Sequence, residues 1–200
     1  QGKEESHAVE RRNARQRRRQ TDRQLRRMRN LAHILQHAGL LPRGDAYTGT
    51  GRDRLIATLD REITQRYEQH GGNGHPSLRQ LPYFLRARAL DEGLEAHELG
   101  RALYHLAQRR GFRSNRKAKK DDEDQGKVAE EIASLRGAMA EAGVRTLGEY
   151  LAQVDPVHER RLRRRWTARA MYEHEFEAIW TAQQAHHPKL LTDGLKKRVF

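Results

Sequence analysis

The chain has 200 residues and a formal net charge of +13 at pH 7, from 40 lysines and arginines against 27 acidic side chains. It contains no cysteine, which excludes disulfide bonds and a cysteine-based zinc site. No apolar run approaches the ~18 residues of a membrane span and no signal-peptide core opens the sequence, so we expect a soluble, intracellular protein without a membrane partner.

The positive charge is concentrated in two stretches. Residues 1–40 carry 11 basic and 4 acidic side chains, a net charge of +7, and residues 101–120 carry 8 basic and no acidic ones. The remaining residues sum to −2. Two basic patches on a nearly neutral frame indicate a footprint for a polyanion.

The first predicted element is a long arginine-rich helix that ends at about Ala38. Residues 10–30 read ERRNARQRRRQTDRQLRRMRN and contain no proline or glycine, and most of these residues are good helix formers. Apolar residues then continue at helical spacing, which predicts that the second half of the helix packs on a body. Gly39 and Pro42 follow in the order typical of a helix end. The apolar positions are Leu25, Met28, Leu31, Ala32, Leu35 and Ala38.

Most of the arginines in this helix share one side, so about half of its circumference is cationic. Guanidinium groups this close repel one another, and arginine favours planar, bidentate contacts with phosphate. A solvated or disordered charge run is the alternative, but the apolar continuation favours a phosphate-binding helix, for RNA or for DNA. The side holds Arg11, Arg15, Arg18, Arg26 and Arg29, flanked by Arg12, Arg19 and Arg23, with Arg27 at its edge.

The rest of the chain is predicted to form further helices. The apolar segment at 78–89 is expected to be interrupted at Pro82, and the acidic run at 121–124 is interpreted as a linker. Thr146 and Glu149 have the spacing of a capping box. Because strand-type alternation is absent, we predict an all-α fold. Helices are expected at residues 52–70, 95–110, 127–142, 146–154 and 155–186, with a last short one from about residue 192.

Enzymatic and metal-binding motifs are absent. His97 and Glu98 begin an HExxH zinc motif, but Arg101 takes the place of the second histidine. His186 and His187 are adjacent, so they point in different directions on a helix and are interpreted as a surface pair. We therefore expect neither catalysis nor a metal or cofactor in this chain.

A basic loop follows the helix predicted at 95–110. Gly111 is placed to end that helix, and the side chains around it suit a sugar-phosphate backbone. A capped helix followed by a soluble loop would not explain the local charge of +8. Aromatic residues are scarce near the basic patches, which argues against base stacking. The candidate contacts are Arg109, Arg110, Arg113, Ser114, Asn115, Arg116 and Lys117.

These segments resemble one known family. The arginine helix, followed by YFLRARALDE (83–92) and ELGRALYHLAQRRGFRSNRK (98–117), is similar to the type II CRISPR effector nucleases (the Cas-nine family), particularly their compact subtypes. RTLGEYLAQVD (145–155) and TARAMYEHEFEAIW (167–180) extend the resemblance in the same order. The resemblance covers most of the chain.

The resemblance implies three parts: an arginine-rich bridge helix at 1–40, a first helical recognition subdomain with the basic loop at 41–120, and a second helical part of the recognition lobe at 121–200. The RuvC and HNH centres of the family, with the Mg²⁺ that they use, have no counterpart here. We therefore expect a fragment that is not an enzyme by itself, and that belongs to an antiviral system of the prokaryotic cytoplasm.

The resemblance also implies the partners. These are the guide RNA (crRNA–tracrRNA), bound at its repeat–antirepeat duplex and seed, the target DNA through the guide–target heteroduplex, and the nuclease domains of the parent protein. Arg86 and Arg88 are weaker RNA-contact candidates than the basic loop, and the arginines at 160–165 are weaker still. The implied bridge-helix contacts are Arg11, Arg12, Arg15, Arg18, Arg19, Arg23, Arg26 and Arg27.

Two other functions share the charge distribution. A free-standing helical RNA-binding protein, such as a chaperone, would need the basic patches but not the family motifs in this order. A structural scaffold could instead dock an acidic protein on the same patches.

Overall fold

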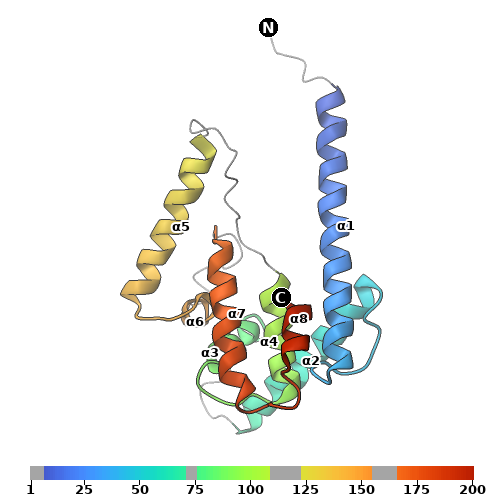
Figure 1. Ribbon diagram of the computed structural model, residues 1–200, viewed down its shortest axis with the longest axis vertical. Coiled ribbons are helices and arrows are strands. Elements are labelled where there is room, and N and C mark those ends of the chain that lie inside the picture. Colours follow the sequence, from blue (N-terminus) through green and yellow to red (C-terminus); the bar gives the residue numbers. More distant parts are fainter. Residues whose placement is uncertain (1–6, 71–75, 109–122, 155–165) are drawn as a thin grey trace.

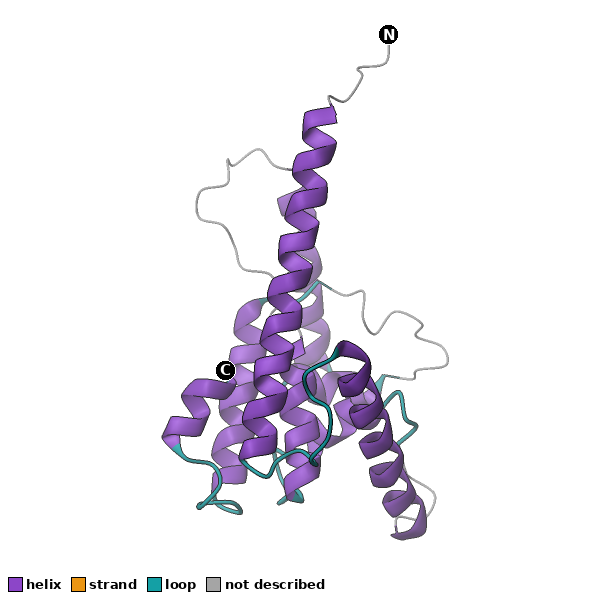
Figure 2. Ribbon diagram, turned by 90° about the vertical axis from the view of Figure 1, so that its right-hand side faces the viewer, coloured by secondary structure: helices purple, strands orange, loops and turns teal. Residues whose placement is uncertain are grey.

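The computed structural model describes residues 7–70, 76–108, 123–154 and 166–200. These residues form eight helices and no strand, which confirms the predicted all-α fold. Most of the helices gather around a shared core, and half of the first helix extends beyond it (Figures 1 and 2). In the described part of the chain, no helix is both long and apolar enough to cross a membrane.

The first helix, α1, spans His7–His37 and ends in a Schellman motif. Gly39 has a φ of +71°, in the left-handed region that favours glycine. The Leu40 N–H donates to the Leu35 carbonyl at 2.8 Å, and the Gly39 N–H donates to the Gln36 carbonyl at 3.1 Å. Leu35 and Leu40 are fully buried, as the hydrophobic pair of this motif requires. The predicted glycine stop is confirmed.

Three helices contact the second half of α1: α2 (Gly49–His70), α4 (Ala96–Gln108) and α8 (Asp193–Val199). Leu25 was predicted on the packed face but is 48% exposed, so packing begins at Met28, almost one turn later. The buried side chains of α1 are Met28, Leu31, Ala32 and Leu35.

The remaining helices form the other side of the body. α3 (Leu81–Arg88) packs against α4 and against α6 (Leu147–Gln153). α7 (Arg169–Gln184) also contacts α4 and α6. α5 (Glu123–Glu141) lies farther out (Figure 1), and its Leu135 joins the core. The arginine half of α1 is therefore the part of the described chain that extends farthest from this body.

Four helix predictions differ from the structure. The helix predicted over 155–186 was wrong at residues 166–168, which are not helical: α7 begins at Arg169, after the extended residue Ala168. α2 begins at Gly49, three residues early, because the Thr48 hydroxyl oxygen accepts the Gly51 N–H at 3.0 Å. The interruption predicted at Pro82 was wrong: this proline lies in the first turn of α3, where no helical hydrogen bond is lost. The linker predicted for the acidic run was partly wrong, since α5 already begins at Glu123.

Threonine caps start the two short helices α6 and α8. Thr146 Oγ1 accepts the Glu149 N–H at 3.2 Å, and Thr192 Oγ1 accepts the Leu195 N–H at 3.2 Å. The Glu149 carboxylate accepts the Arg145 N–H at 2.7 Å, one residue before the cap. The capping box predicted at 146–149 is thus confirmed, except that the Glu149 side chain accepts the N–H of Arg145 instead of that of the cap residue Thr146.

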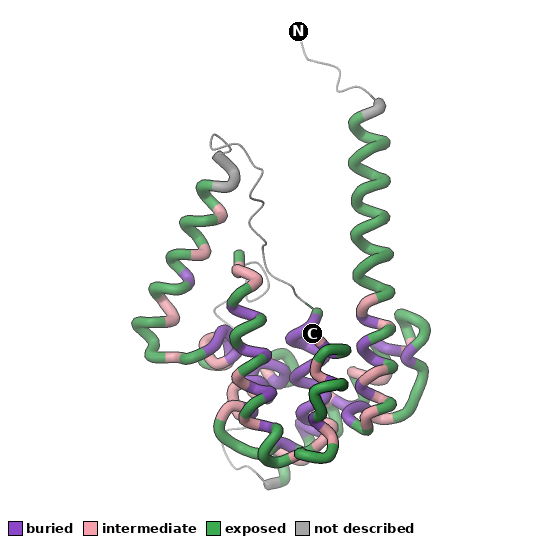
Figure 3. Tube along the Cα trace, in the orientation of Figure 1, coloured by how far each residue is buried: buried purple, intermediate pink, exposed green. Residues whose placement is uncertain are grey.

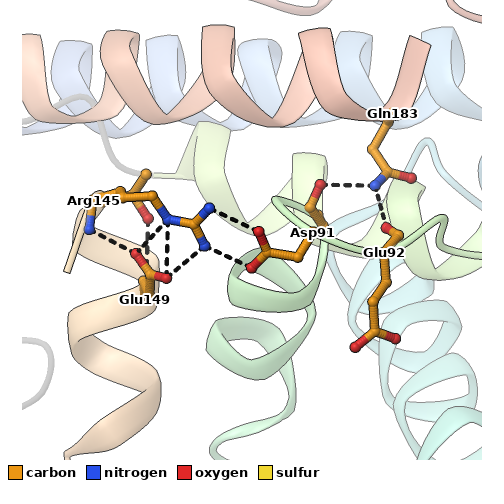
Figure 4. Close-up of polar contacts among 7 residues, drawn as sticks. Asp91, Glu92, Arg145, Glu149 and Gln183 are labelled. Carbon is orange, nitrogen blue, oxygen red and sulfur yellow. Dashed lines mark hydrogen bonds and ion pairs between the residues drawn. The ribbon is translucent and has the colours of Figure 1, made fainter. Parts of the chain in front are cut away.

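Polar side chains fix the segment that joins α3 to α4. The Arg145 guanidinium donates to both oxygens of Asp91, at 2.7 and 2.6 Å, and also binds Glu149 (Figure 4). The Gln183 amide of α7 donates to the carbonyls of Ala89 and Glu92, at 2.7 and 2.6 Å. The joining segment is therefore attached to α6 and α7.

Gly100 lets α4 pass close to the chain that follows α1. A Cβ on Gly100 would lie 1.6 Å from the Leu40 carbonyl oxygen. Gly100→Ala is therefore expected to lower the free energy of unfolding by about 2–4 kcal/mol in urea titrations, because backbone must move apart.

Gly137 in α5 is the matched control. No atom lies within 4 Å of its added Cβ, so Gly137→Ala should raise the free energy of unfolding by about 0.5–1 kcal/mol. Equal changes in the two variants would contradict the close approach at Gly100.

Candidate nucleic-acid interface

The arginine-rich half of α1 stands clear of the body. Every residue at 9–26 is exposed, and burial begins only beyond that point (Figure 3). At a rise of 1.5 Å per residue, the exposed part is about 27 Å long. Seven of the eight predicted bridge-helix contacts lie on it: Arg11, Arg12, Arg15, Arg18, Arg19, Arg23 and Arg26.

The cationic side of α1 faces away from the core. Helical residues two apart point about 200° apart, and Arg26 and Arg29 each precede a buried side chain by two residues, Met28 and Leu31. Toward the N-terminus of α1, arginines that precede Arg26 by steps of three or four residues lie on the same outward side of the helix. A shallow furrow on this exposed half is lined by Arg12, Arg15, Gln16, Arg19, Gln20 and Arg23.

The furrow is electrostatically unbalanced. In the part of the chain that the structure describes, Arg12, Arg15, Arg19 and Arg23 have no carboxylate within ion-pair distance. Their mutual repulsion destabilises the helix unless an anion lies along it. A phosphate backbone carries regularly spaced negative charge and can relieve this repulsion.

Arg27, the eighth predicted contact, lies where α1 meets the body. It is half-buried, and its guanidinium donates to the carbonyl of Gln108 at 3.4 Å. Gln108 is the last residue of α4. The predicted basic loop at 109–117 follows it directly and lies outside the described residues. The structure thus places the point where that loop begins beside the arginine helix.

Arg86 is a buried structural residue, and the prediction that it contacts RNA was wrong. Its side chain is 2% exposed, and its Nε and Nη2 each donate to a different oxygen of Glu175 at 2.6 Å. Burial alone would lower the pKa of Arg86, but the Glu175 carboxylate outweighs it and raises the pKa, so the charge persists. Glu175 also accepts the Gly148 N–H at 3.0 Å, which joins α3, α6 and α7.

Arg88 is largely engaged within the protein. Its guanidinium lies 5.0 Å from the centre of the Tyr67 ring and 5.5 Å from that of Phe84, and it pairs with Glu92. Burial, with a contribution from Glu98, raises the pKa of Tyr67 to about 12, so the ring stays neutral under this cation. Arg88 therefore stabilises the contact of α2 with α3, and its predicted RNA contact stays a prediction.

The third basic cluster, at 160–165, lies outside the described residues. Arg169 follows it at the start of α7 and pairs with Glu173 at 2.6 Å. Together with Arg27 and Arg198 it lines a cavity of about 330 Å³ between α1, α4, α7 and α8. Arginines from α1, α7 and α8 thus line the same cavity.

The structure also shows basic-patch residues that the sequence prediction missed. Tyr47, in the turn between α1 and α2, lies against the Arg29 guanidinium, with 4.7 Å from the Arg29 Cζ to the ring centre. The expectation that aromatics are scarce near the arginines does not hold here. Asp45 is a residue type that favours turns, because its carboxylate can accept the N–H two residues later, and it could have indicated an ordered turn around Tyr47.

The histidine motifs form no metal centre. Arg101, in the incomplete HExxH motif, instead binds Asp60 and joins α4 to α2. His105 is buried against the Tyr83 ring, with 4.7 Å between ring centres. Among the residues described, no three histidine or carboxylate side chains are grouped to hold a metal ion.

Comparisons with known proteins give a structural match. The sequence matches no protein-family model and no curated protein. The fold is similar to Campylobacter jejuni Cas9 in a complex with sgRNA and target DNA (AGAAACA PAM), at a TM-score of 0.61 and 21% identity, covering 98% of this chain and 25% of that one.

The fold of this chain is Cas9-like. A second C. jejuni Cas9 complex (AGAAACC PAM) gives the same TM-score of 0.61 and 21% identity over all of this chain and 25% of that one. The St1Cas9–sgRNA–tDNA20–AcrIIA6 dimeric assembly gives 0.59 and 18% identity over all of this chain and 21% of that one. The chain thus spans about a quarter of the length of these Cas9 proteins, and at this identity the likeness shows the fold.

Proposed function

We propose that this chain is the guide-RNA-binding, non-catalytic part of an RNA-guided DNA endonuclease of the Cas9 type, close to its compact subtypes. In this proposal α1 is the bridge helix, and α2 to α8 form the helical recognition lobe. The observation that carries the proposal is the arginine-rich half of α1, which is exposed over residues 9–26 and extends from a Cas9-like body (Figure 3).

Shape and charge favour RNA helices as the ligand. An A-form helix hides its base edges in a deep, narrow groove and presents phosphates and 2′-hydroxyls. A row of outward-facing guanidinium groups can bind that backbone with little dependence on base sequence. The proposed ligands are therefore the repeat–antirepeat duplex and seed of the guide RNA, and the guide–target heteroduplex that brings in the target DNA.

The proposed division of labour leaves cleavage to other domains. The furrow and the loop at 109–117 offer cations, amides and hydroxyls, which bind and orient a backbone but supply no nucleophile or metal. RuvC and HNH domains of the parent protein, with Mg²⁺, would cut the DNA. The loop residues named above are proposed to bind RNA, together with the α1 arginines Arg11, Arg12, Arg15, Arg18, Arg19, Arg23, Arg26 and Arg27.

Ribonuclease footprinting tests this function. The chain is expected to protect the repeat–antirepeat duplex and the seed of a crRNA–tracrRNA guide from cleavage, while distal hairpins stay accessible. Uniform protection along the RNA would contradict guide recognition. Capture of an acidic protein that survives nuclease treatment would favour a scaffold instead.

The free-standing RNA-binding alternative has its own test. RuvC and HNH domains from a compact Cas9, supplied in trans, are expected to cut guide-matched DNA only when this chain is present. Protection of the guide without any gain of cleavage would favour a chaperone.

A further inference from the structure

A pocket of about 420 Å³ lies at the foot of the exposed half of α1, against the turn that leads into α2. Its walls combine two exposed apolar side chains, Leu25 and Tyr47, with two arginines, Arg26 and Arg29. Five large hydrophobic residues are exposed in the described part of the chain, and two of them meet here, at 48% for Leu25 and 66% for Tyr47. Exposed apolar side chains beside cations make this pocket a candidate for a ligand that has both apolar and anionic parts.

The turn that presents Tyr47 is held in place on both sides. The Asp45 carboxylate accepts the Tyr47 N–H at 2.9 Å and the Thr48 N–H at 3.1 Å. The buried Arg52 guanidinium donates to the carbonyls of Ala46 and Tyr47, at 3.0 and 2.8 Å. The backbone that carries the Tyr47 ring is therefore held in place before any ligand arrives, which lowers the entropic cost of binding.

The pocket offers an aromatic ring on which the base of a nucleotide can stack and arginines that can bind its phosphate. Arg29 covers one part of the Tyr47 ring, and the large exposed fraction leaves ring surface open for a flat, apolar partner. Arg26 and Arg29 continue the outward arginine side of α1, so a phosphate bound there is continuous with a backbone lying along the furrow. Asp22 also lines the pocket and can accept a hydrogen bond from a base amino or sugar hydroxyl group.

We propose that this pocket receives one unpaired nucleotide of the bound RNA, with its base stacked on Tyr47 and its phosphate on Arg26 and Arg29. The inference rests on the proposed RNA-binding function and adds a specificity to it. The arginine furrow binds backbone of any sequence, whereas this pocket selects RNA in which a base is unpaired beside the duplex. An aromatic ring stacks with every base, so the selection is for an extruded base rather than for its identity.

The test compares two short RNA duplexes that differ by one bulged nucleotide, with 2-aminopurine at the bulge. The native chain is expected to bind the bulged duplex roughly tenfold more tightly than the paired one, and to quench the 2-aminopurine fluorescence. Tyr47→Ala should abolish both effects, so that the bulged and the paired duplex bind with equal affinity. Tyr47→Phe should retain both effects.

Leu78→Ala is the matched control, since Leu78 is also a large exposed hydrophobic residue, at 51% against 66% for Tyr47, but lies outside the pocket. It should keep the preference for the bulge. A preference that survives Tyr47→Ala, or an unquenched bulge, would overturn the stacking site and leave the furrow untouched. Failure to bind either duplex would overturn this inference and the proposed function together.

DNA duplexes with the same bulge separate the two nucleic acids. A preference for the bulge in RNA alone would show that the pocket also binds the 2′-hydroxyl of the sugar, from which Asp22 can accept a hydrogen bond. An equal preference in DNA would support a stacking site for any extruded nucleotide. Absence of a preference in both would overturn the inference.

Discussion

Replacing Arg12, Arg15, Arg19 and Arg23 by glutamine is expected to weaken guide-RNA binding by about a thousandfold at 0.1 M salt. Each cation that neutralises a phosphate releases counterions, so losing four contacts should lower the slope of log K against log salt by about 3. The four side chains line one exposed furrow. The difference from the native chain should therefore shrink as salt rises, which fluorescence anisotropy titrations measure directly.

A control variant shows whether the loss of binding depends on the position of the arginines or only on the net charge. Arg43, Arg54, Arg61 and Arg79 are also exposed but do not line the furrow, and their replacement by glutamine removes the same total charge. This control should change the salt slope by less than one unit. Equal losses in the two variants would show a generic polycation and contradict the furrow as a contact site.

Glu175→Gln is expected to lower the free energy of unfolding by about 3–5 kcal/mol. The substitution leaves the buried Arg86 guanidinium without its counter-charge and weakens the acceptor of the Gly148 N–H. For a domain of this size, the midpoint of thermal unfolding should fall by about 10 °C.

Glu173→Gln provides the control, two positions away in the same helix. Its pair with Arg169 is partly exposed, so the variant should change the free energy of unfolding by less than about 1 kcal/mol. Replacing Arg86 and Glu175 together with methionine should give a more stable protein than either single change. A Glu175→Gln variant as stable as the native chain would contradict a structural role for the pair.

Local patterns in the sequence were enough to predict the helices and several of their ends. The stripe at Met28, Leu31 and Leu35 has helical spacing and is buried, and Gly39, which was predicted to stop the helix, does so in the left-handed conformation. These features depend on contacts a few residues apart. The same locality explains why Thr146 could be recognised as a cap.

Arg86 shows why part of the candidate site could not be predicted. Its neighbours in the sequence suggest a basic face, but its partner Glu175 lies 89 residues later, on another helix. No periodicity connects the two positions, so the sequence alone does not distinguish a surface arginine from a buried one. Burial of charge is decided by tertiary pairing.

Leu25 and Tyr47 show the same limit at the edge of the body. Leu25 fits the apolar spacing of α1, yet it remains 48% exposed. Tyr47 lies in a turn-rich segment with few apolar neighbours, and only the folded turn brings it to Arg29. The pocket therefore emerges from the contact between two elements.

A salt titration with three ligands tests the central claim most directly. The ligands are a guide RNA with its repeat–antirepeat duplex, an unrelated RNA duplex and a DNA duplex. The proposed function predicts that the guide RNA stays bound at salt concentrations where the other two have dissociated. Equal affinities that fall together as salt rises would contradict guide recognition and leave only non-specific attraction to phosphate.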